Sequence, residues 1–289
     1  MKKTLVVLFL TITCFGVSAQ NEGRIGIFSG VSMTSLYNAD DAGYGDYLPT
    51  FKPTMGLEAG YHFTLFKMLP MGISVQFANN KMGQNYRGFY ADSTSYYAYS
   101  RLNYLRSGLA LNFGTNPRRQ VALAMSVGAN IGFLTGYQER YELIRYNNDR
   151  LILDINETDV TLNDTAEIKG TLTSPMYNKT DMCAFGTLGL DFIIAKNWVF
   201  GFYGRFDYGL SSVENQSKMN INYDTEPSSS SNYKIFNTVV KYHGPTDDKI
   251  THSTTVNLAY GVFLTLKYRI YNKEKIEFYY RENSRYNHD

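Results

Sequence analysis

Residues 121–133 read VALAMSVGANIGF and carry the clearest strand pattern in the chain. Every odd-numbered position is apolar, and every even-numbered position is small or polar. Because successive side chains of a strand point to opposite faces, this pattern predicts a strand with one apolar face and one small-residue face. Such a strand extends over roughly 43 Å, and a tilt of about 45° leaves roughly 30 Å along the membrane normal. The stretch is therefore long enough to cross a bilayer.

Seven further stretches repeat this alternation. They cover residues 24–36, 55–65, 71–78, 104–113, 187–194, 200–208 and 256–270. The connections between the eight stretches alternate in length: those at 37–52, 82–100, 138–181 and 211–253 are long, and those at 66–70, 114–118 and 195–197 are short. Outer-membrane barrels have short periplasmic turns and longer extracellular loops. The sequence therefore predicts an all-β fold, an eight-stranded antiparallel up-and-down transmembrane β-barrel, with both termini in the periplasm.

The N-terminus has the three parts of a secretory signal. Lys2 and Lys3 form the positive end, residues 5–14 form the apolar core, and residues 17–19 (VSA) form a small-residue cleavage site. We expect a signal peptide over 1–19, a barrel over 20–271 and a charged periplasmic tail over 272–289. A lipoprotein anchored at Cys14 is the alternative, but Thr13 departs from the small residue that such sites require. Cleavage would leave Cys183 as the only cysteine, which excludes an internal disulfide.

Alternation alone does not say which face of each strand meets solvent. A soluble, secreted, ligand-binding β-barrel or a β-sandwich would turn the apolar face inward. The other face, however, is mostly Gly, Ala, Ser and Thr, whereas a wet surface is rich in Lys and Glu. Aromatic residues such as Phe63, Trp198 and Tyr268 also gather near strand ends, as in the aromatic girdles of membrane barrels. These features favour an apolar face in contact with lipid.

Charged and polar side chains of both signs then fall on the inward face. This lumen set comprises Glu58, His62, Arg106, Asp191, Arg205, Asp207, Lys267 and Arg269. An eight-stranded barrel has an interior just wide enough to be filled by its own side chains. We therefore expect an ion-pair and hydrogen-bond network that fills the lumen. A proton or ion path is the alternative, although no ring of a single sign lines the interior as selective pores require.

The long loops hold the remaining candidates for metal binding and catalysis. His243, Asp247, Asp248 and His252 lie close together in the chain, as do Asp40, Asp41 and Asp46. Neither spacing is that of a zinc or calcium site, so we expect no metal and no cofactor. No nucleophile motif accompanies the histidines, so we expect no enzyme. Ser93 and Thr165 sit in Asp-Ser/Thr-small tripeptides, which makes them candidate O-glycan acceptors.

Residues 103–113, NYLRSGLALNF, carry a family resemblance. The stretch resembles the PorT-like, OmpA/OmpX-like eight-stranded outer-membrane barrels of Bacteroidota, which usually show NYLEIPLLLK there. Arg106 and Gly108 depart from the usual Glu and Pro. The resemblance implies a location in the bacterial outer membrane and no single activity, since some relatives assist protein secretion.

A non-enzymatic structural or interaction role through the extracellular loops is the function we expect. The alternatives are an accessory of protein secretion and a small pore or transporter. The expected partners are outer-membrane lipid and lipopolysaccharide, together with periplasmic or secretion proteins bound through the C-terminal tail. The net charge of +2 implies no nucleic acid.

Overall fold

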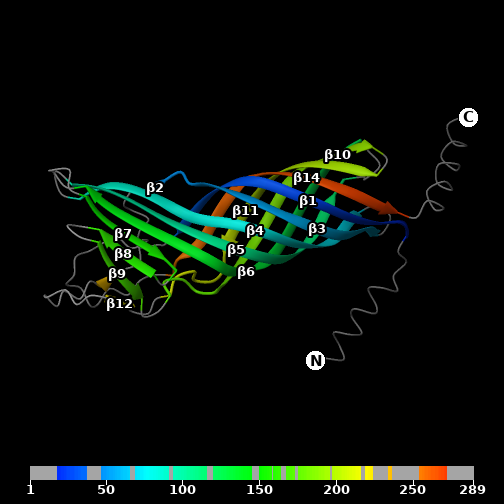
Figure 1. Ribbon diagram of the computed structural model, residues 1–289. Helices are drawn as coiled ribbons and strands as arrows, with labels where there is room; N and C mark the ends of the chain where they lie inside the picture. Colours follow the sequence, from blue (N-terminus) through cyan, green and yellow to red (C-terminus); the bar gives the residue numbers. More distant parts are fainter. Residues whose placement is uncertain are drawn as a thin grey trace, which may run out of the picture.

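The computed structural model describes residues 18–37, 47–65, 69–90, 94–115, 120–144, 150–157, 159–163, 167–172, 175–195, 197–215, 219–223, 234–235 and 254–271. Eight long strands form a closed barrel in the middle of the molecule (Figure 1). They are β1 (Ser18–Tyr37), β3 (Phe51–Leu65), β4 (Leu69–Tyr90), β5 (Thr94–Gly114), β6 (Val121–Ile144), β10 (Thr180–Ala195), β11 (Trp198–Gly209) and β14 (Val256–Tyr271). The described residues contain no helix with the length and hydropathy that a transmembrane span needs.

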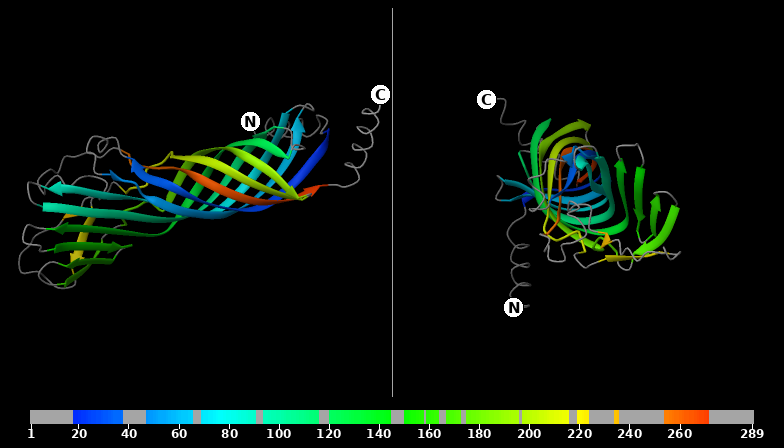
Figure 2. Two further views of the ribbon diagram at one scale, coloured as in Figure 1. Left: turned by 90° about the horizontal axis from the view of Figure 1, so that it is seen from above. Right: turned by 90° about the vertical axis from the view of Figure 1, so that its left-hand side faces the viewer.

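Every neighbouring pair of barrel strands is antiparallel. The order around the ring is β1, β3, β4, β5, β6, β10, β11 and β14, and β14 pairs with β1 to close it. The closing register runs from Glu22 opposite Tyr271 to Tyr37 opposite Val256. The predicted eight-stranded antiparallel barrel is therefore confirmed, and the end-on view in Figure 2 shows the closed ring.

The apolar faces of the strands point out of the barrel, as predicted. Leu109, Val127 and Leu188 are 62%, 48% and 58% exposed, whereas the alternate positions of the same strands are mostly buried or half-buried. We call this surface the outward belt; it includes the odd-numbered residues 121–133 of β6 and their equivalents on the other seven strands. Lipid acyl chains cover such an apolar surface, whereas its exposure to water would be unfavourable. The soluble alternative requires the opposite orientation.

Three connections at one end of the barrel are short, namely those between β3 and β4, β5 and β6, and β10 and β11. The start of β1 and the end of β14 lie at that same end. Short turns face the periplasm in outer-membrane barrels, so we assign this end to the periplasm and the opposite end to the cell exterior.

The expectation of a loop over residues 82–100 is wrong. β4 and β5 continue past the outward belt as a paired hairpin, from Lys81 opposite Asn103 to Tyr90 opposite Thr94. This segment is tyrosine-rich and polar, so it lacks the apolar alternation by which strands are recognised in a sequence. Gly83 takes a φ of 137° within it, and a Cβ there would lie 2.0 Å from the Ser100 carbonyl oxygen. Only glycine fits that position without strain.

Additional strands replace much of the loop expected at 138–181, and short strands also occur within the loops expected at 37–52 and 211–253. They are β2 (Tyr47–Leu48), β7 (Arg150–Asn156), β8 (Asp159–Asn163), β9 (Glu167–Leu172), β12 (Met219–Tyr223) and β13 (Lys234–Ile235). β7, β8, β9 and β12 pair in that order, starting from the outer half of β6. Figure 2 shows them beyond the barrel and to one side of it. We call β7, β8, β9 and β12, with the outer halves of β4, β5 and β6, the extracellular sheet.

A cation placed in the middle of the outward belt should destabilise the barrel. We expect Val127→Arg to lower the free energy of unfolding by about 2–4 kcal/mol, because the charge would lie in hydrocarbon. Urea titration of the full chain refolded into phospholipid vesicles measures this, with the fluorescence of the single tryptophan, Trp198, as the signal. Thr171→Arg, on the exposed face of β9, is the matched control and should change stability by about 0.5 kcal/mol or less. Equal losses in both variants would contradict the lipid assignment.

Candidate functional site

Charged side chains on the inner faces of six barrel strands meet in the lumen. The luminal network comprises the carboxylates Glu22, Glu58, Asp181, Asp191 and Asp207 and the cations Arg24, Arg106, Arg205, Lys267 and Arg269. Each member occupies a position opposite in parity to its outward neighbours, so strand alternation alone directs it inward. The two signs are equal in number, and every member has an oppositely charged partner.

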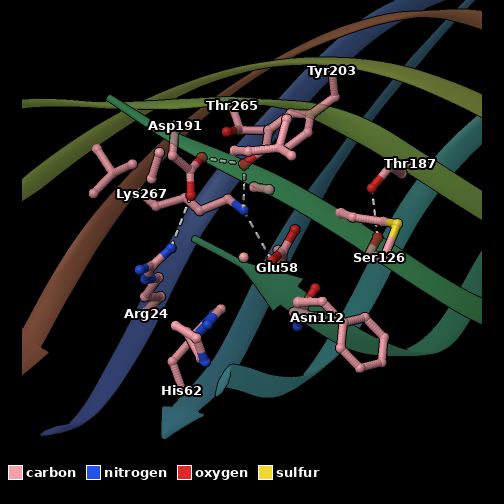
Figure 3. Close-up of a pocket in the computed structure, with 18 of the residues that line it drawn as sticks. Arg24, Glu58, His62, Asn112, Ser126, Thr187, Asp191, Tyr203, Thr265 and Lys267 are labelled. Carbon is pink, nitrogen blue, oxygen red and sulfur yellow. Dashed lines mark hydrogen bonds and ion pairs between the residues drawn. The ribbon is translucent and has the colours of Figure 1, made fainter. Parts of the chain in front are cut away.

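Arg24 organises the periplasmic end of the luminal network. Its guanidinium contacts Glu22 at 2.5 Å and Asp191 at 3.0 Å, which links β1 to β10 across the lumen. Glu22 also accepts from Arg269 at 2.5 Å and so joins β1 to β14, the pair of strands that closes the barrel. Figure 3 shows Arg24 directed at Asp191.

Lys267 and Tyr203 continue the network toward the middle of the barrel. The Lys267 ammonium lies 3.2 Å from a Glu58 carboxylate oxygen, and the Tyr203 hydroxyl donates to Asp191. Lys267 Nζ also lies 3.5 Å from the Tyr203 hydroxyl, so both acids are connected through these two side chains (Figure 3).

Arg205 carries the network past the middle of the lumen. Gln76 donates to Glu58 at 3.3 Å and accepts from Arg205 at 3.0 Å. Arg205 then donates twice to Asp207, with both distances 2.9 Å, in the forked geometry that makes guanidinium–carboxylate pairs strong. Its guanidinium also lies 4.1 Å from the centre of the Phe185 ring.

Arg106 and Asp181 form the extracellular end of the network. They are almost fully buried and lie 2.5 Å apart, and Arg106 also lies 4.0 Å from Asp207. Asn257 donates to Asp181 at 2.8 Å, and the Cys183 thiol does so at 3.2 Å. Connected side chains therefore run along the lumen from Glu22 to Asp181.

A cavity of about 90 Å³ adjoins the periplasmic half of the network. His62, Asn112, Ser126, Thr187 and Thr265 line it together with the charged side chains of Figure 3. His62 Nε2 and Thr265 Oγ1 are buried without a hydrogen-bond partner among the described residues. A polar cavity of this size has room for a few water molecules, which would satisfy both atoms.

An apolar cluster covers the extracellular end of the network. Its buried members are Leu36, Met82, Leu102, Tyr104, Tyr137, Ile155, Val160, Met176, Tyr177, Val213 and Ala259, and we call it the extracellular cap. Residues 175–178 and 212–215 are held across it by main-chain bonds, including Asn178 N–H to the Val213 carbonyl at 2.8 Å. The Tyr137 and Tyr177 rings meet edge to face, with their centres 5.0 Å apart. The cap thus closes the mouth of the barrel with side chains from barrel and loop segments.

A buried polar cluster of Tyr177, Ser100 and Glu139 anchors the cap. The Tyr177 hydroxyl and the Ser100 hydroxyl, at 3.0 Å, both donate to Glu139, which is itself buried on β6. Burial, followed by the negative charge of Glu139, raises the pKa of Tyr177 well above its usual range. Tyr177 therefore keeps its proton and remains a donor to Glu139 at any physiological pH.

The structure brings seven of the eight residues of the predicted lumen set into the network: Glu58, Arg106, Asp191, Arg205, Asp207, Lys267 and Arg269. His62 lines the cavity instead. The sequence analysis missed Glu22, Arg24 and Asp181. Arg24 and Glu22 are even-numbered, as are the other inward-facing residues of β1, so extending the alternation of the first strand by two residues would have identified both. Asp181 was assigned to a loop, whereas it lies in β10.

Several sequence-based predictions fall outside the described residues. They concern the candidate glycan acceptors Ser93 and Thr165, the histidine and aspartate groups of the loops, most of the signal peptide and the tail 272–289. Within the described part of the chain, no three His, Cys, Asp or Glu side chains are grouped as a metal site requires.

A double-mutant cycle on Glu58 and Lys267 tests whether bulk water reaches the network. Breaking a buried ion pair from one side leaves an unpaired charge, so we expect Glu58→Gln and Lys267→Met each to cost about 3 kcal/mol, and the double variant to cost less than their sum. Urea unfolding in vesicles provides the measurement. Arg140→Met with Asp154→Asn is the control cycle, because that pair lies 3.7 Å apart and is one-third exposed. Its coupling should be about 1 kcal/mol or less. Equal couplings in the two cycles would mean that water reaches the lumen pair freely.

Comparison with known proteins gives one family match and several similar solved structures. The family model of the outer membrane protein beta-barrel domain matches residues 18–215. No curated protein matches the sequence. Solved structures with similarity include Neisserial surface protein A (8% identity, 86% of this chain and 97% of that chain, TM-score 0.32) and OprG from Pseudomonas aeruginosa (11%, 89% and 98%, TM-score 0.35). The outer membrane protease OmpT from Escherichia coli is a third (10%, 89% and 99%, TM-score 0.38).

Proposed function

Because the chain belongs to the outer membrane protein beta-barrel family, we propose that it is a non-conducting, non-enzymatic barrel that displays the extracellular sheet at the cell surface. The observation that carries this proposal is the unbroken luminal network from Glu22 to Asp181, with the apolar cap above it. A lumen filled by mutually paired charges offers a permeating ion neither a free path nor a ring of uncompensated charge.

Among the described residues, the lumen also shows no nucleophile and base held together as hydrolytic catalysis needs. His62 is the only histidine among the described residues, and its Nε2 has no hydrogen-bond partner there, so no described hydroxyl is paired with this nitrogen. The five acids of the network are committed to cations, which holds them as structural carboxylates. This supports a non-enzymatic role.

The extracellular sheet supports an interaction role. β7 to β9 and β12 lie outside the barrel ring, and the cap packs Ile155 and Val160 of β7 and β8 against barrel side chains. The sheet is therefore joined to the barrel by a core as well as by backbone pairing. Recognition surfaces are commonly built as loops or sheet edges on a rigid support of this kind.

We further propose that the chain is a PorT-like barrel of Bacteroidota, because residues 103–113 resemble that family's motif. In the structure this stretch lies on β5, with Arg106 directed into the network. Arg106 stands where the family usually has Glu, and its positive charge is paired with the carboxylate of Asp181.

Planar-bilayer recording tests the closed lumen. The full chain should show no steady single-channel openings in concentrated KCl, because the network and the cap both obstruct the lumen. A general porin inserted in the same bilayer provides the positive control. Folding of the protein is verified by a shift in gel migration on heating. Steady openings of the folded protein would overturn the closed-lumen proposal and favour a small pore.

Cysteine labelling in intact cells tests the display of the extracellular sheet. Thr171→Cys on β9 should react with a membrane-impermeant maleimide, whereas Thr115→Cys at the β5–β6 turn should react only after the outer membrane is permeabilised. Both positions are exposed, and the native Cys183 is fully buried, so background labelling should be low. The reverse pattern would invert the orientation.

A further inference from the structure

Two arginines and two tyrosines share one face of the β4–β5 hairpin beyond the outward belt. Arg87 lies opposite Tyr97, and Tyr99 and Arg101 follow Tyr97 at every second position of β5. Alternate residues of a strand share a face, so all four side chains have the outward parity of Leu105 further down β5. We call Arg87, Tyr97, Tyr99 and Arg101 the arginine–tyrosine strip; it belongs to the extracellular sheet.

Contacts between its own side chains hold the strip in place. The Arg101 guanidinium lies 4.2 Å from the centre of the Tyr99 ring, and the Tyr97 and Tyr99 rings meet edge to face with their centres 6.3 Å apart. Tyr99 is buried beneath this group, whereas Arg87 and Arg101 are exposed and Tyr97 is half-buried. The accessible side chains are therefore partly ordered before any ligand arrives, which lowers the entropy cost of binding.

The positive charge of the strip is not compensated within the described part of the chain. Neither β4 nor β5 contains an aspartate or a glutamate. Two acids on the same face of β6 and β7, Glu142 and Asp154, pair with other arginines. No ion pair between an acid and Arg87 or Arg101 is found among the described residues. Charge complementarity therefore favours an anionic partner.

The spacing of the two arginines suits an extended ligand. Arg101 lies opposite Gly83, and Arg87 is four residues further along β4, which corresponds to about 14 Å. This distance exceeds the length of one sugar ring, so a ligand that meets both guanidinium groups carries recurring charges along a chain. The half-buried amides of Asn85 and Gln138 lie on the same face and can bond to hydroxyl groups.

An acidic peptide is less suited to this surface than a glycan. β5 pairs with β4 on one side and with β6 on the other, so it offers no free edge at which a peptide could add as a strand. Protein partners are usually anchored by side chains that fill a desolvated pocket. The strip instead presents planar guanidinium groups and a tyrosine ring on an open sheet face.

We propose that the arginine–tyrosine strip binds a linear acidic polysaccharide whose sugar rings carry carboxylates. Arg87 and Arg101 would each hold one carboxylate through two parallel N–H bonds, for which the guanidinium group has the matching geometry. The Tyr97 ring would lie against the sugar between them, since tyrosine offers a large contact area with little conformational freedom to lose. This inference rests on the proposed display of the extracellular sheet and names the class of ligand that the sheet recognises.

Isothermal titration calorimetry of the full chain in detergent micelles, with hexagalacturonate as the ligand, tests the proposal. The R87Q/R101Q variant should bind about 25-fold more weakly than the unaltered chain, since each exposed bidentate ion pair contributes roughly fivefold. The matched control is K169Q/K179Q, which removes the same charge from exposed extracellular positions outside the strip. It should bind as the unaltered chain does. A shift in gel migration on heating verifies that each variant is folded.

Two further ligands separate the sugar from its charge. Fully methyl-esterified hexagalacturonate keeps the rings but has no carboxylates, so it should bind the unaltered chain and R87Q/R101Q equally weakly. Hexaglutamate carries the same charge on a flexible peptide, so it should bind the unaltered chain about tenfold more weakly than hexagalacturonate does.

Three results would overturn the proposal: no detectable binding of hexagalacturonate, equal binding of it by the unaltered chain and R87Q/R101Q, or equally tight binding of hexaglutamate. The last result would assign the strip to acidic peptides. None of them would bear on whether the sheet is displayed at the cell surface, because purified protein in micelles exposes both ends of the barrel. Display is tested separately by the cysteine labelling of intact cells.

Discussion

Closure of the strand ring by the pairing of β1 with β14 is the constraint on which the rest of the structure depends. In hydrocarbon, every backbone N–H and C=O group needs a partner within the protein, and a closed ring of strands supplies one for each. Closure also fixes what the side chains must do. One parity of every strand meets lipid, and the other parity meets seven other strands in a narrow interior.

The narrow interior explains why the luminal charges are balanced. A charge that enters a space without bulk water is costly unless an opposite charge accompanies it. Several of the ion pairs join different strands: Arg24 links β1 to β10, and Lys267 links β14 to β3. These pairs hold strands on different sides of the lumen in a fixed position relative to one another, and they also neutralise the charge of the lumen. The apolar extracellular cap solves the same space-filling problem where the strands leave the membrane.

Strand number, closure and the lipid-facing parity follow from the sequence because a transmembrane strand alternates strictly between two solvents. Most of the luminal network follows from the same parity, as Arg205 and Asp207 illustrate. Where a strand extends beyond the lipid, it no longer needs an apolar outward face, so the alternating pattern that identifies it in the sequence is lost. Residues 82–90 and 94–100 lie beyond the outward belt and carry no apolar period, although one of their faces is buried at Met82 and Ser100. Gly83 reveals its need for a positive φ only in the folded hairpin. Asp181 was missed because the preceding segment 175–179 belongs to the cap, whose partners are distant in sequence.

The ion pair between Glu22 and Arg269 joins positions 247 residues apart. The first and last strands of the barrel thus have to find each other across the entire chain, and neither can complete its backbone bonding before the other is present. No N-terminal portion can become a finished barrel while the remainder is still being exported. Topologies dominated by such distant contacts fold slowly. The exported chain must therefore persist as an open, edge-bearing intermediate, which makes protection during periplasmic transit a requirement of this architecture.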